Sequence, residues 1–255
     1  MRGLAIYGVG GMGRHVAYLA RRQDFGEIVF VSDMGVEVGS IVNGLPVISF
    51  ADLVSDVHRE KPVSIAIADV SARRRLAEKC KTHGLVTTSL FSPDAVVHQP
   101  FLIGEGAIVC AFTTIEDNAR IGSHLHLHVY SYIAHDCVVG SFVTFAPRVS
   151  CNGRVVIEDD VYIGTGAIIK PGTRERPLRI GRGAYIGMGT LVTKAVPRNA
   201  VFVGNRGAVL RRRWRRPCEA DTPGKSYPGA APTPTAQGWR MRRAQVVLKF
   251  SPCSE

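Results

Sequence analysis

An aliphatic residue returns at every sixth position across the middle of this 255-residue chain. Stepping by six from Val97 to Ile169, and again from Ile180 to Val192 after a slip of five residues, meets an apolar side chain at all sixteen positions. A period of six fits neither the 3.6-residue helix nor the two-residue alternation of an ordinary strand. It is typical of a solenoid that turns a corner after each hexad. The spacing therefore predicts a left-handed parallel β-helix of about five coils, three hexads to a coil.

Glycine directly follows several of these aliphatic residues, as at Gly104, Gly122 and Gly140. Because glycine reaches the positive backbone angles that a tight turn can need, we expect these glycines to form the corners. The slip of five residues lies in "KPGTRERPLR", at 170–179, and predicts a loop that projects from one face. We expect its arginines to lie in solvent, with contact to the phosphates of a cofactor as the alternative; they are Arg174, Arg176 and Arg179.

The first 92 residues have a different pattern, in which strand-like and helix-like segments alternate. Apolar segments at 3–9, 27–33, 63–69 and 85–90 are separated by helical patterns at 11–22, 49–57 and 71–84. Such alternation predicts a parallel sheet. We therefore divide the chain into a small Rossmann-like α/β domain at 1–92, the β-helix at 93–210 and a tail at 211–255.

The tail carries most of the charge. Its ten Lys/Arg and three Asp/Glu account for +7 of the net +11, and it holds six of the fourteen prolines and both tryptophans. Such a composition buries too little apolar surface to order itself, so we expect disorder, with a basic interaction arm as the sharper alternative. The other residues carry little excess charge, so we expect no nucleic-acid partner.

Cysteine and hydropathy patterns bear on the compartment. The six cysteines lack CxxC spacing, and reduced thiols in a cytoplasmic protein are the simple interpretation. No apolar run approaches the ~18 residues of a membrane-spanning helix, and the opening "MRGLAIYGVGG" lacks an export signal pattern. We expect neither a membrane span nor a leader.

A glycine-rich turn, "AIYGVGGMGRHV", joins the first strand to the first helix. Gly8, Gly10 and Gly13 have GxGxxG spacing, which in this context indicates a nucleotide-diphosphate site at a helix N-terminus. NAD is the obvious ligand, but about 90 residues supply only one mononucleotide half, which suits a ligand with one nucleoside such as a nucleotide-linked sugar. A turn that binds nothing is the structural alternative. Asp33 ends the second strand, where it would accept hydrogen bonds from the base or ribose.

Four of the eight histidines lie close together, in "SHLHLHVYSYIAHDC". His124, His126 and His128 fall at different offsets in the hexad frame, so they should point in different directions and share no ion. We expect no metal site, and partly exposed polar side chains instead.

His135 differs because it stands two places after the inward Ile133, with Asp136 beside it. Gly153 lies eighteen residues on, one coil higher in the same column. Coils are about 4.8 Å apart, so a glycine there should leave space open above the imidazole. Asp136 would hold the tautomer of the ring, or serve only as a turn residue.

The segment "IAHDCVVGSFVTFAPRVSCNGRVVIEDDVYIGTGAIIKPG", after "YGVGGMGRHV" and before "AVFVGN", resembles the hexapeptide-repeat sugar acyltransferases. That family includes sialic acid O-acetyltransferases and N-acetyltransferases of nucleotide-linked 4-amino sugars. The resemblance covers residues 1 to about 210. It implies a homotrimer with active sites between subunits, an acetyl-CoA donor, a sugar acceptor, no metal, and a role in polysaccharide biosynthesis.

The resemblance also implies site residues. His135 matches the catalytic base and Asp136 its neighbouring carboxylate. Our own hypothesis adds Gly153 to the residues that contact acetyl-CoA, because a backbone N–H near it would stabilise the oxyanion. The residues that match the acetyl-CoA groove are Thr144, Thr165 and Met188, and those that match the acceptor-nucleotide contacts are Gly10, Gly11, Met12, Ser32, Asp33, Ala68 and Asp69. Many relatives have histidine in place of Thr144 and of Met12, which affects the contact to the acetyl group and the acceptor site.

We expect His135 to remove a proton from the acceptor amine, or hydroxyl, while that atom attacks the thioester directly. The amine of a nucleotide-linked 4-amino sugar is favoured, with O-acetylation of sialic acid as the alternative. A nicotinamide-dependent oxidoreductase, a zinc hydratase and a non-catalytic β-helix scaffold are rival interpretations. An oxidoreductase leaves the hexads unexplained.

Overall fold

The structure is a computed structural model, and it describes residues 2–33, 38–55 and 57–204. The predicted tail at 211–255 lies outside the described residues. Among the described helices, none is long and apolar enough to cross a membrane. The four cysteines within the described ranges are buried and unpaired.

The N-terminal region is a five-stranded sheet in the order β3-β4-β2-β1-β5. Its parallel strands are β1 (Arg2–Tyr7), β2 (Phe25–Val31), β4 (Leu45–Ile48) and β5 (Val63–Ile65). The helices are α1 (Gly11–Arg21), α2 (Phe50–Leu53) and α3 (Val70–Thr82). The predicted parallel α/β arrangement is therefore confirmed.

Two local details of this sheet differ from the prediction. β3 (Ile41–Val42) pairs antiparallel with β4, a hairpin that the sequence analysis did not anticipate. The segment at 85–90 is no sheet strand of this domain. Thr87 makes one isolated bridge to Val63, and β6 (Leu90–Phe91) pairs with the β-helix instead. The β-helix pairing therefore begins at Leu90, three residues before the predicted start at 93.

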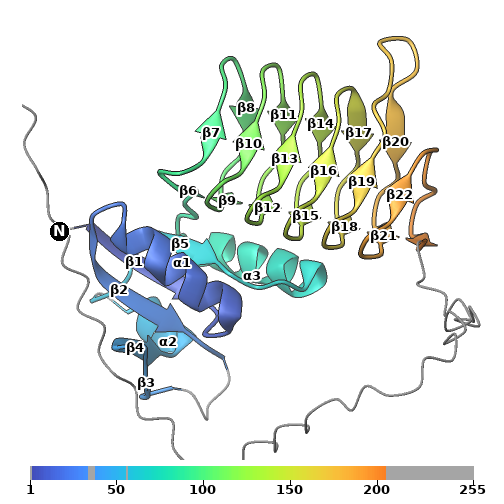
Figure 1. Cartoon of the computed structure of the whole chain (residues 1–255). Coiled ribbons are helices and arrows are strands. Elements are labelled where there is room, and N and C mark those ends of the chain that lie inside the picture. Colours follow the sequence, from blue (N-terminus) through green and yellow to red (C-terminus); the bar gives the residue numbers. More distant parts are fainter. Residues whose placement is uncertain (1, 34–37, 56, 205–255) are drawn as a thin grey trace, which may run out of the picture. The chain divides into compact units, whose positions relative to one another are not determined.

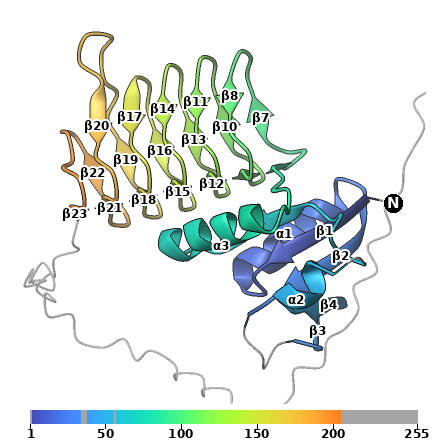
Figure 2. The same ribbon diagram turned by 180° about the vertical axis from the view of Figure 1, so that it is seen from behind.

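The hexad region forms three parallel sheets, one for each face of the β-helix (Figures 1 and 2). The seven-stranded sheet contains β6, β9 (Ile108–Val109), β12 (His126–Leu127), β15 (Thr144–Phe145), β18 (Tyr162–Ile163), β21 (Tyr185–Ile186) and β23 (Val201–Phe202). The six-stranded sheet contains β7 (Val96–Val97), β10 (Thr114–Ile115), β13 (Tyr132–Ile133), β16 (Ser150–Cys151), β19 (Ile168–Ile169) and β22 (Leu191–Val192). The five-stranded sheet contains β8 (Leu102–Ile103), β11 (Arg120–Ile121), β14 (Val138–Val139), β17 (Val155–Ile157) and β20 (Leu178–Ile180).

The hexad positions form the interior, as predicted. Ile115 pairs with Ile133, and Ile133 with Cys151, so residues eighteen apart stack in one column. All three are fully buried, within one apolar cluster that runs through the coils. The left-handed β-helix is confirmed.

The corner glycines have a different physical reason from the predicted one. Left-handed backbone angles occur three residues after the inward residue, and non-glycine residues such as Asn118 and Asp136 adopt them. The glycines directly after the inward residue are needed for close approach between coils. A Cβ on Gly122 would lie 2.6 Å from the backbone nitrogen of Ser141 in the next coil.

The insertion between β19 and β20 projects beyond the other coils, as predicted (Figure 1). Arg174 and Arg176 in this loop are exposed, and so is Arg179 in β20. The start of the loop lies next to Gly153 in the preceding coil, since the N–H of Gly172 donates to the carbonyl of Gly153 at 3.0 Å.

The outer face of the seven-stranded sheet is covered by the α/β region. Leu90 and Ile108 belong to the same apolar cluster as Leu4, Ile6 and Phe30. In both views α3 runs along the row of strands that contains β12, β15 and β18 (Figures 1 and 2). The corner between the six-stranded and five-stranded sheets lies on the opposite side of the coil from this covered face.

Candidate active site

His135 and Asp136 occupy one corner of the β-helix, directly after β13. Asp136 has a φ of 57°, a left-handed angle that aspartate tolerates better than most residues. At that position its Oδ2 lies 2.9 Å from Nδ1 of His135. Asp136 is therefore both the turn residue and the partner of the imidazole, the two roles that the sequence left open.

The charge on Asp136 selects one tautomer of His135. The hydrogen bond from His135 lowers the pKa of Asp136, and Arg154, 3.5 Å away, lowers it further. Asn118 also donates to this carboxylate, at 3.3 Å. Because an ionised carboxylate only accepts hydrogen bonds, Nδ1 carries the proton of this bond, and in the neutral form of the ring the lone pair is therefore on Nε2. This arrangement suits a general base.

Gly153 packs against the ring of His135. A Cβ on Gly153 would lie 2.6 Å from Nε2 and 2.7 Å from Cε1. The imidazole itself therefore fills the space that a side chain at 153 would take. The prediction of an open space above the ring is wrong in this respect, since the open space lies beside the ring instead.

That space is a depression of 530 Å³, lined by His135, Gly153, Thr114, Glu116, Tyr132, Ala134, Asn152 and Pro171. Glu116 Oε2 accepts the backbone N–H of His135 at 3.0 Å, and the hydroxyl of Tyr132 donates to Asn152 Oδ1 at 3.0 Å. The sequence analysis missed Glu116, Tyr132 and Asn152. Steps of eighteen residues from Ala134, the neighbour of His135, reach Glu116 one coil back and Asn152 one coil on, so the same arithmetic would have found both.

The three residues matched to the acetyl-CoA groove do not lie together in the chain. Thr165 and Met188 are exposed, in one column at the corner between the seven-stranded and six-stranded sheets, where Thr165 accepts a hydrogen bond from Gly189. Thr144 is only 2% exposed on the covered face, and its hydroxyl accepts a hydrogen bond from Arg73 at 2.9 Å. Its side chain is unavailable to a ligand in this arrangement, so Thr144 is removed from the candidate site.

A second cavity, of 490 Å³, opens at the carboxyl ends of β1, β2 and β5. Six of the seven residues matched to the acceptor nucleotide line it, namely Gly10, Gly11, Met12, Ser32, Asp33 and Ala68. Asp69 does not line it. Its side chain caps α3 by accepting the N–H of Ala72 at 2.6 Å.

The glycine-rich turn has the geometry of an anion site. Gly8 has a φ of 110°, which side-chain-bearing residues rarely adopt, and a Cβ on Gly13 would lie 1.9 Å from the carbonyl oxygen of Gly8. Gly10 is the N-cap of α1 and provides no side-chain cap. The first N–H groups of α1 are therefore left for a ligand, and the helix dipole favours a negative one.

Asp33 is held in place at the edge of this cavity. Tyr7 donates to its Oδ2 at 2.5 Å, and Lys79 Nζ lies 3.1 Å from both carboxylate oxygens. Burial, reinforced by the bond to Asp33, raises the pKa of Tyr7, so its hydroxyl remains a donor. Each carboxylate oxygen has lone pairs to spare, so the group can still accept hydrogen bonds from a ligand.

The expectation of partial exposure is confirmed for His128 and wrong for His124 and His126. His124 and His126 are 4% and 0% exposed, because α3 and the corner at Phe142 cover them. Burial lowers the pKa of His124 to about 4 and that of His126 well below 6.5, so both are neutral. No group of three potential metal ligands occurs within the described ranges.

Comparison with known proteins agrees with this geometry. Residues 3–80 match the PglD N-terminal domain family. The chain is 42% identical over 213 residues to GDP-perosamine N-acetyltransferase of Escherichia coli O157:H7, covering 81% of this chain and 96% of the relative. The chain belongs to the hexapeptide-repeat nucleotide 4-amino-sugar N-acetyltransferase family.

Solved structures of this family superimpose on most of the described residues. WeeI from Acinetobacter baumannii AYE has a TM-score of 0.77 and 42% identity, covering 80% of this chain and 98% of its own. The acetyltransferase domain of PglB from Neisseria gonorrhoeae FA1090, in complex with acetyl coenzyme A, has a TM-score of 0.72 and 30% identity, covering 80% and 97%. The matched share agrees with the extent of the two folded regions.

Proposed function

We propose that this N-acetyltransferase transfers an acetyl group from acetyl-CoA to the amine of a nucleotide-linked 4-amino sugar. The relative at 42% identity carries the name GDP-perosamine N-acetyltransferase, which makes GDP-perosamine the first acceptor to test. The PglB domain supports the donor, because its structure contains acetyl coenzyme A. We place the enzyme in the cytoplasm and in polysaccharide biosynthesis.

The observation that carries this proposal is the His135–Asp136 pair beside Gly153. Nε2 of His135 accepts a proton from the acceptor amine as the nitrogen attacks the thioester carbonyl. The C–S bond then breaks, the amide forms, and the proton passes to the departing CoA thiolate. A general base of this kind contributes ~10²–10⁴ in rate, and positioning of the two substrates contributes the rest.

The oxyanion of the tetrahedral intermediate needs a donor near the same ring. Within the described residues the backbone N–H of Gly153 donates to no acceptor. Gly153 lies against His135, so one N–H is available where charge develops. A donor in such a position is worth on the order of 3 kcal/mol when water is excluded.

The cavity at the glycine-rich turn would bind the nucleotide of the acceptor. The N-terminus of α1 would receive the diphosphate, and Asp33 would accept hydrogen bonds from the ribose or base. The cavity walls include Gly10, Gly11, Met12 and Ala68. One such site per chain suits a single nucleoside.

The distance between these two regions within the fold supports a homotrimer. No residue lines both the nucleotide cavity and the depression at His135. The first belongs to the region that covers the seven-stranded sheet, and the second to the opposite corner of the coil. We infer that the active site is completed between subunits, with Thr165 and Met188 of one copy facing His135 of its neighbour across acetyl-CoA.

The test is release of the CoA thiol across a panel of nucleotide 4-amino sugars and sialic acids. We expect release with a nucleotide 4-amino sugar, and a loss of at least about 100-fold in kcat for His135→Ala with unchanged nucleotide Kd. Release only with sialic acids would refute the acceptor, and near-normal turnover of His135→Ala would refute the mechanism.

A further inference from the structure

Arg73 is a fully buried arginine on α3 whose guanidinium reaches the outer face of the seven-stranded sheet. Burial lowers its pKa to about 10, so it remains charged at neutral pH. None of the ion pairs among the described residues includes Arg73, and its hydrogen bonds go to neutral groups. A buried charge is costly unless hydrogen bonds compensate it, so the role of Arg73 depends on the groups to which it donates.

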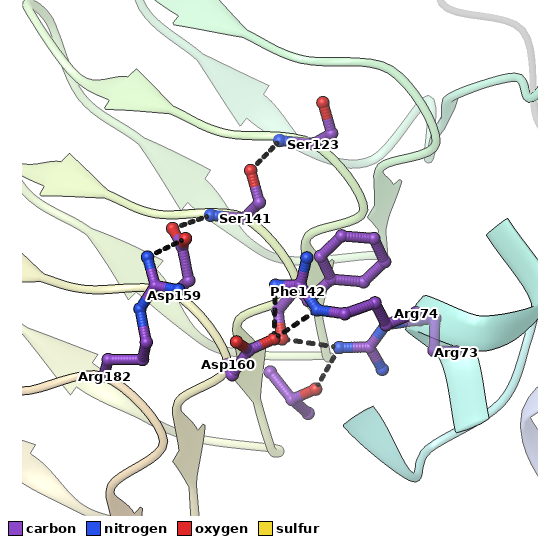
Figure 3. A network of polar contacts seen from close by, with 9 residues as sticks. Arg73, Arg74, Ser123, Ser141, Phe142, Asp159, Asp160 and Arg182 are labelled. Atoms are coloured by element: carbon purple, nitrogen blue, oxygen red, sulfur yellow. Dashed lines mark hydrogen bonds and ion pairs between the residues drawn. The ribbon is translucent and has the colours of Figure 1, made fainter. Parts of the chain in front are cut away.

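The guanidinium joins two segments that are far apart in the sequence. On one side it donates to the carbonyls of Ile67 at 2.9 Å and Ala68 at 3.4 Å. On the other it donates to the carbonyl of Phe142 and the hydroxyl of Thr144, both at 2.9 Å (Figure 3). Arg73 therefore ties the loop after β5 to the β-helix.

His126 makes a second tie at the same place. Its Nε2 lies 3.0 Å from the carbonyl of Ile65, and its Nδ1 lies 3.1 Å from Arg73. A carbonyl only accepts and a guanidinium only donates, so His126 is the neutral tautomer with its proton on Nε2. The main chain is thus anchored at three carbonyls on either side of Ala66, those of residues 65, 67 and 68.

That anchored segment is one wall of the nucleotide cavity. Ala66, Ile67 and Ala68 line the cavity beside the glycine-rich turn, since β1 and β5 are paired neighbours. The two walls are in contact, because a Cβ on Gly8 would lie 2.7 Å from Cδ1 of Ile67 and 3.2 Å from the carbonyl oxygen of Ala66. A shift of the segment therefore changes the width of the cavity.

We propose that Arg73, with His126, is a positioning residue that sets the width of the acceptor-nucleotide site by tying its wall to the β-helix. The inference rests on the proposed function of that cavity. Arg73 lies outside the cavity and should nevertheless affect binding of the acceptor. It should not affect binding of acetyl-CoA, because His135 lies at the opposite corner of the coil.

Arg74, the next residue, offers a matched control. It also links α3 to the β-helix, since Nε donates to Asp160 Oδ1 at 3.0 Å and its guanidinium lies 4.1 Å from the ring centre of Phe142 (Figure 3). Among the described residues, its side-chain hydrogen bonds, ion pair and ring contact go to Asp160 and Phe142 and not to the segment that lines the cavity. Loss of Arg74 therefore weakens attachment between the two regions without releasing the wall.

The experiment compares Arg73→Met and Arg74→Met in the full-length protein by calorimetric titration with GDP, UDP and dTDP, and separately with acetyl-CoA. We expect Arg73→Met to raise the Kd of the nucleotide that the wild type binds about tenfold, the ratio that 1.4 kcal/mol produces. Its acetyl-CoA Kd should stay within about twofold, and Arg74→Met should leave both constants within that limit.

An equal rise for both variants, or a parallel rise in the acetyl-CoA Kd, would mean that Arg73 only holds the regions together. If Arg73→Met does not fold, Thr144→Val removes one acceptor of Arg73 and should raise the nucleotide Kd by about two- to threefold, a net loss on the order of 0.5 kcal/mol. An unchanged Kd in that variant also overturns the proposal. A wild type that binds none of the three nucleotides refutes the assignment of the cavity itself, which is a different result.

Discussion

Gly153→Ala should remove catalysis while leaving the fold intact. The added Cβ would lie 2.6 Å from Nε2 of His135, 2.7 Å from Cε1 and 3.1 Å from Cδ2, so ring and methyl group cannot coexist. The side chain of His135 is 42% exposed and is free to swing into solvent. The ring should therefore move, and the hydrogen bond between Nδ1 and Asp136 should break.

The cost of this movement to stability is small. The φ of Gly153 lies outside the left-handed region, so alanine fits the backbone and gains about 0.4–1 kcal/mol by restricting the unfolded chain. The lost hydrogen bond is exposed and is worth about 0.5–1 kcal/mol. The two terms nearly cancel, whereas displacement of a general base should lower kcat by ~10²–10⁴.

Two measurements test this prediction: thiol release from acetyl-CoA, and the thermal midpoint. Gly204→Ala is the control, because its Cβ would meet only Cγ2 of Thr190 at an ordinary 3.8 Å. The double variant Gly153→Ala/His135→Ala should be no slower than His135→Ala alone, since both remove one function. A further loss in the double variant, or a kcat for Gly153→Ala within threefold of wild type, would refute displacement of the ring.

Two other changes test the nucleotide cavity and the covered face. Asp33→Asn removes a charged acceptor worth roughly 1.5 kcal/mol, so it should raise the nucleotide Kd about tenfold and leave the acetyl-CoA Kd unchanged. Calorimetric titration measures both constants, and an unchanged nucleotide Kd would contradict the proposed role of Asp33. His124, His126 and His128 all have pKa values lowered by burial, to about 4 for His124 and His128, so below pH 6.5 the unfolded chain binds protons that the folded chain does not. The free energy of unfolding should therefore decrease as the pH falls below 6.5, by up to about 1.4 kcal/mol per pH unit for each histidine. His124→Phe keeps a ring against Phe142 and should reduce that slope by about a third between pH 6.5 and 4.5 in denaturant titrations; an unchanged slope would show that His124 is not neutral in the folded chain.

The hexad pattern predicted the β-helix because the interior of each coil admits only apolar side chains, and three hexads complete a coil. The same arithmetic placed Gly153 over His135, since register in a parallel stack is eighteen residues. It correctly identified which residues share a column. It misjudged the glycines such as Gly122, because the period shows where a small residue recurs and not whether a backbone angle or a neighbouring coil requires it.

The sequence did not show what covers each outer face. His126 and Thr144 occupy outward positions, and outward positions of a hexad usually meet solvent. In this fold α3 covers them, and Arg73 from α3 bonds to both. A contact between residues more than fifty positions apart leaves no local pattern in either segment, so periodicity alone could not predict the burial of these side chains or the role of Arg73.

The hexad repeat therefore relates stability and function to different positions, the inward and the outward residues of each hexad. Inward positions such as Ile133 are determined by packing, so changes there should act through the free energy of unfolding. Outward positions are free of that constraint, and the fold uses them differently on each side of the coil. The covered face carries neutral groups, Ile108, His126 and Thr144, that can be buried against the α/β region, whereas the opposite corner keeps Asp136 and His135 in contact with water. The negative charge of Asp136 costs little where water solvates it, so the corner that the α/β region leaves uncovered suits the proposed pair of carboxylate and imidazole.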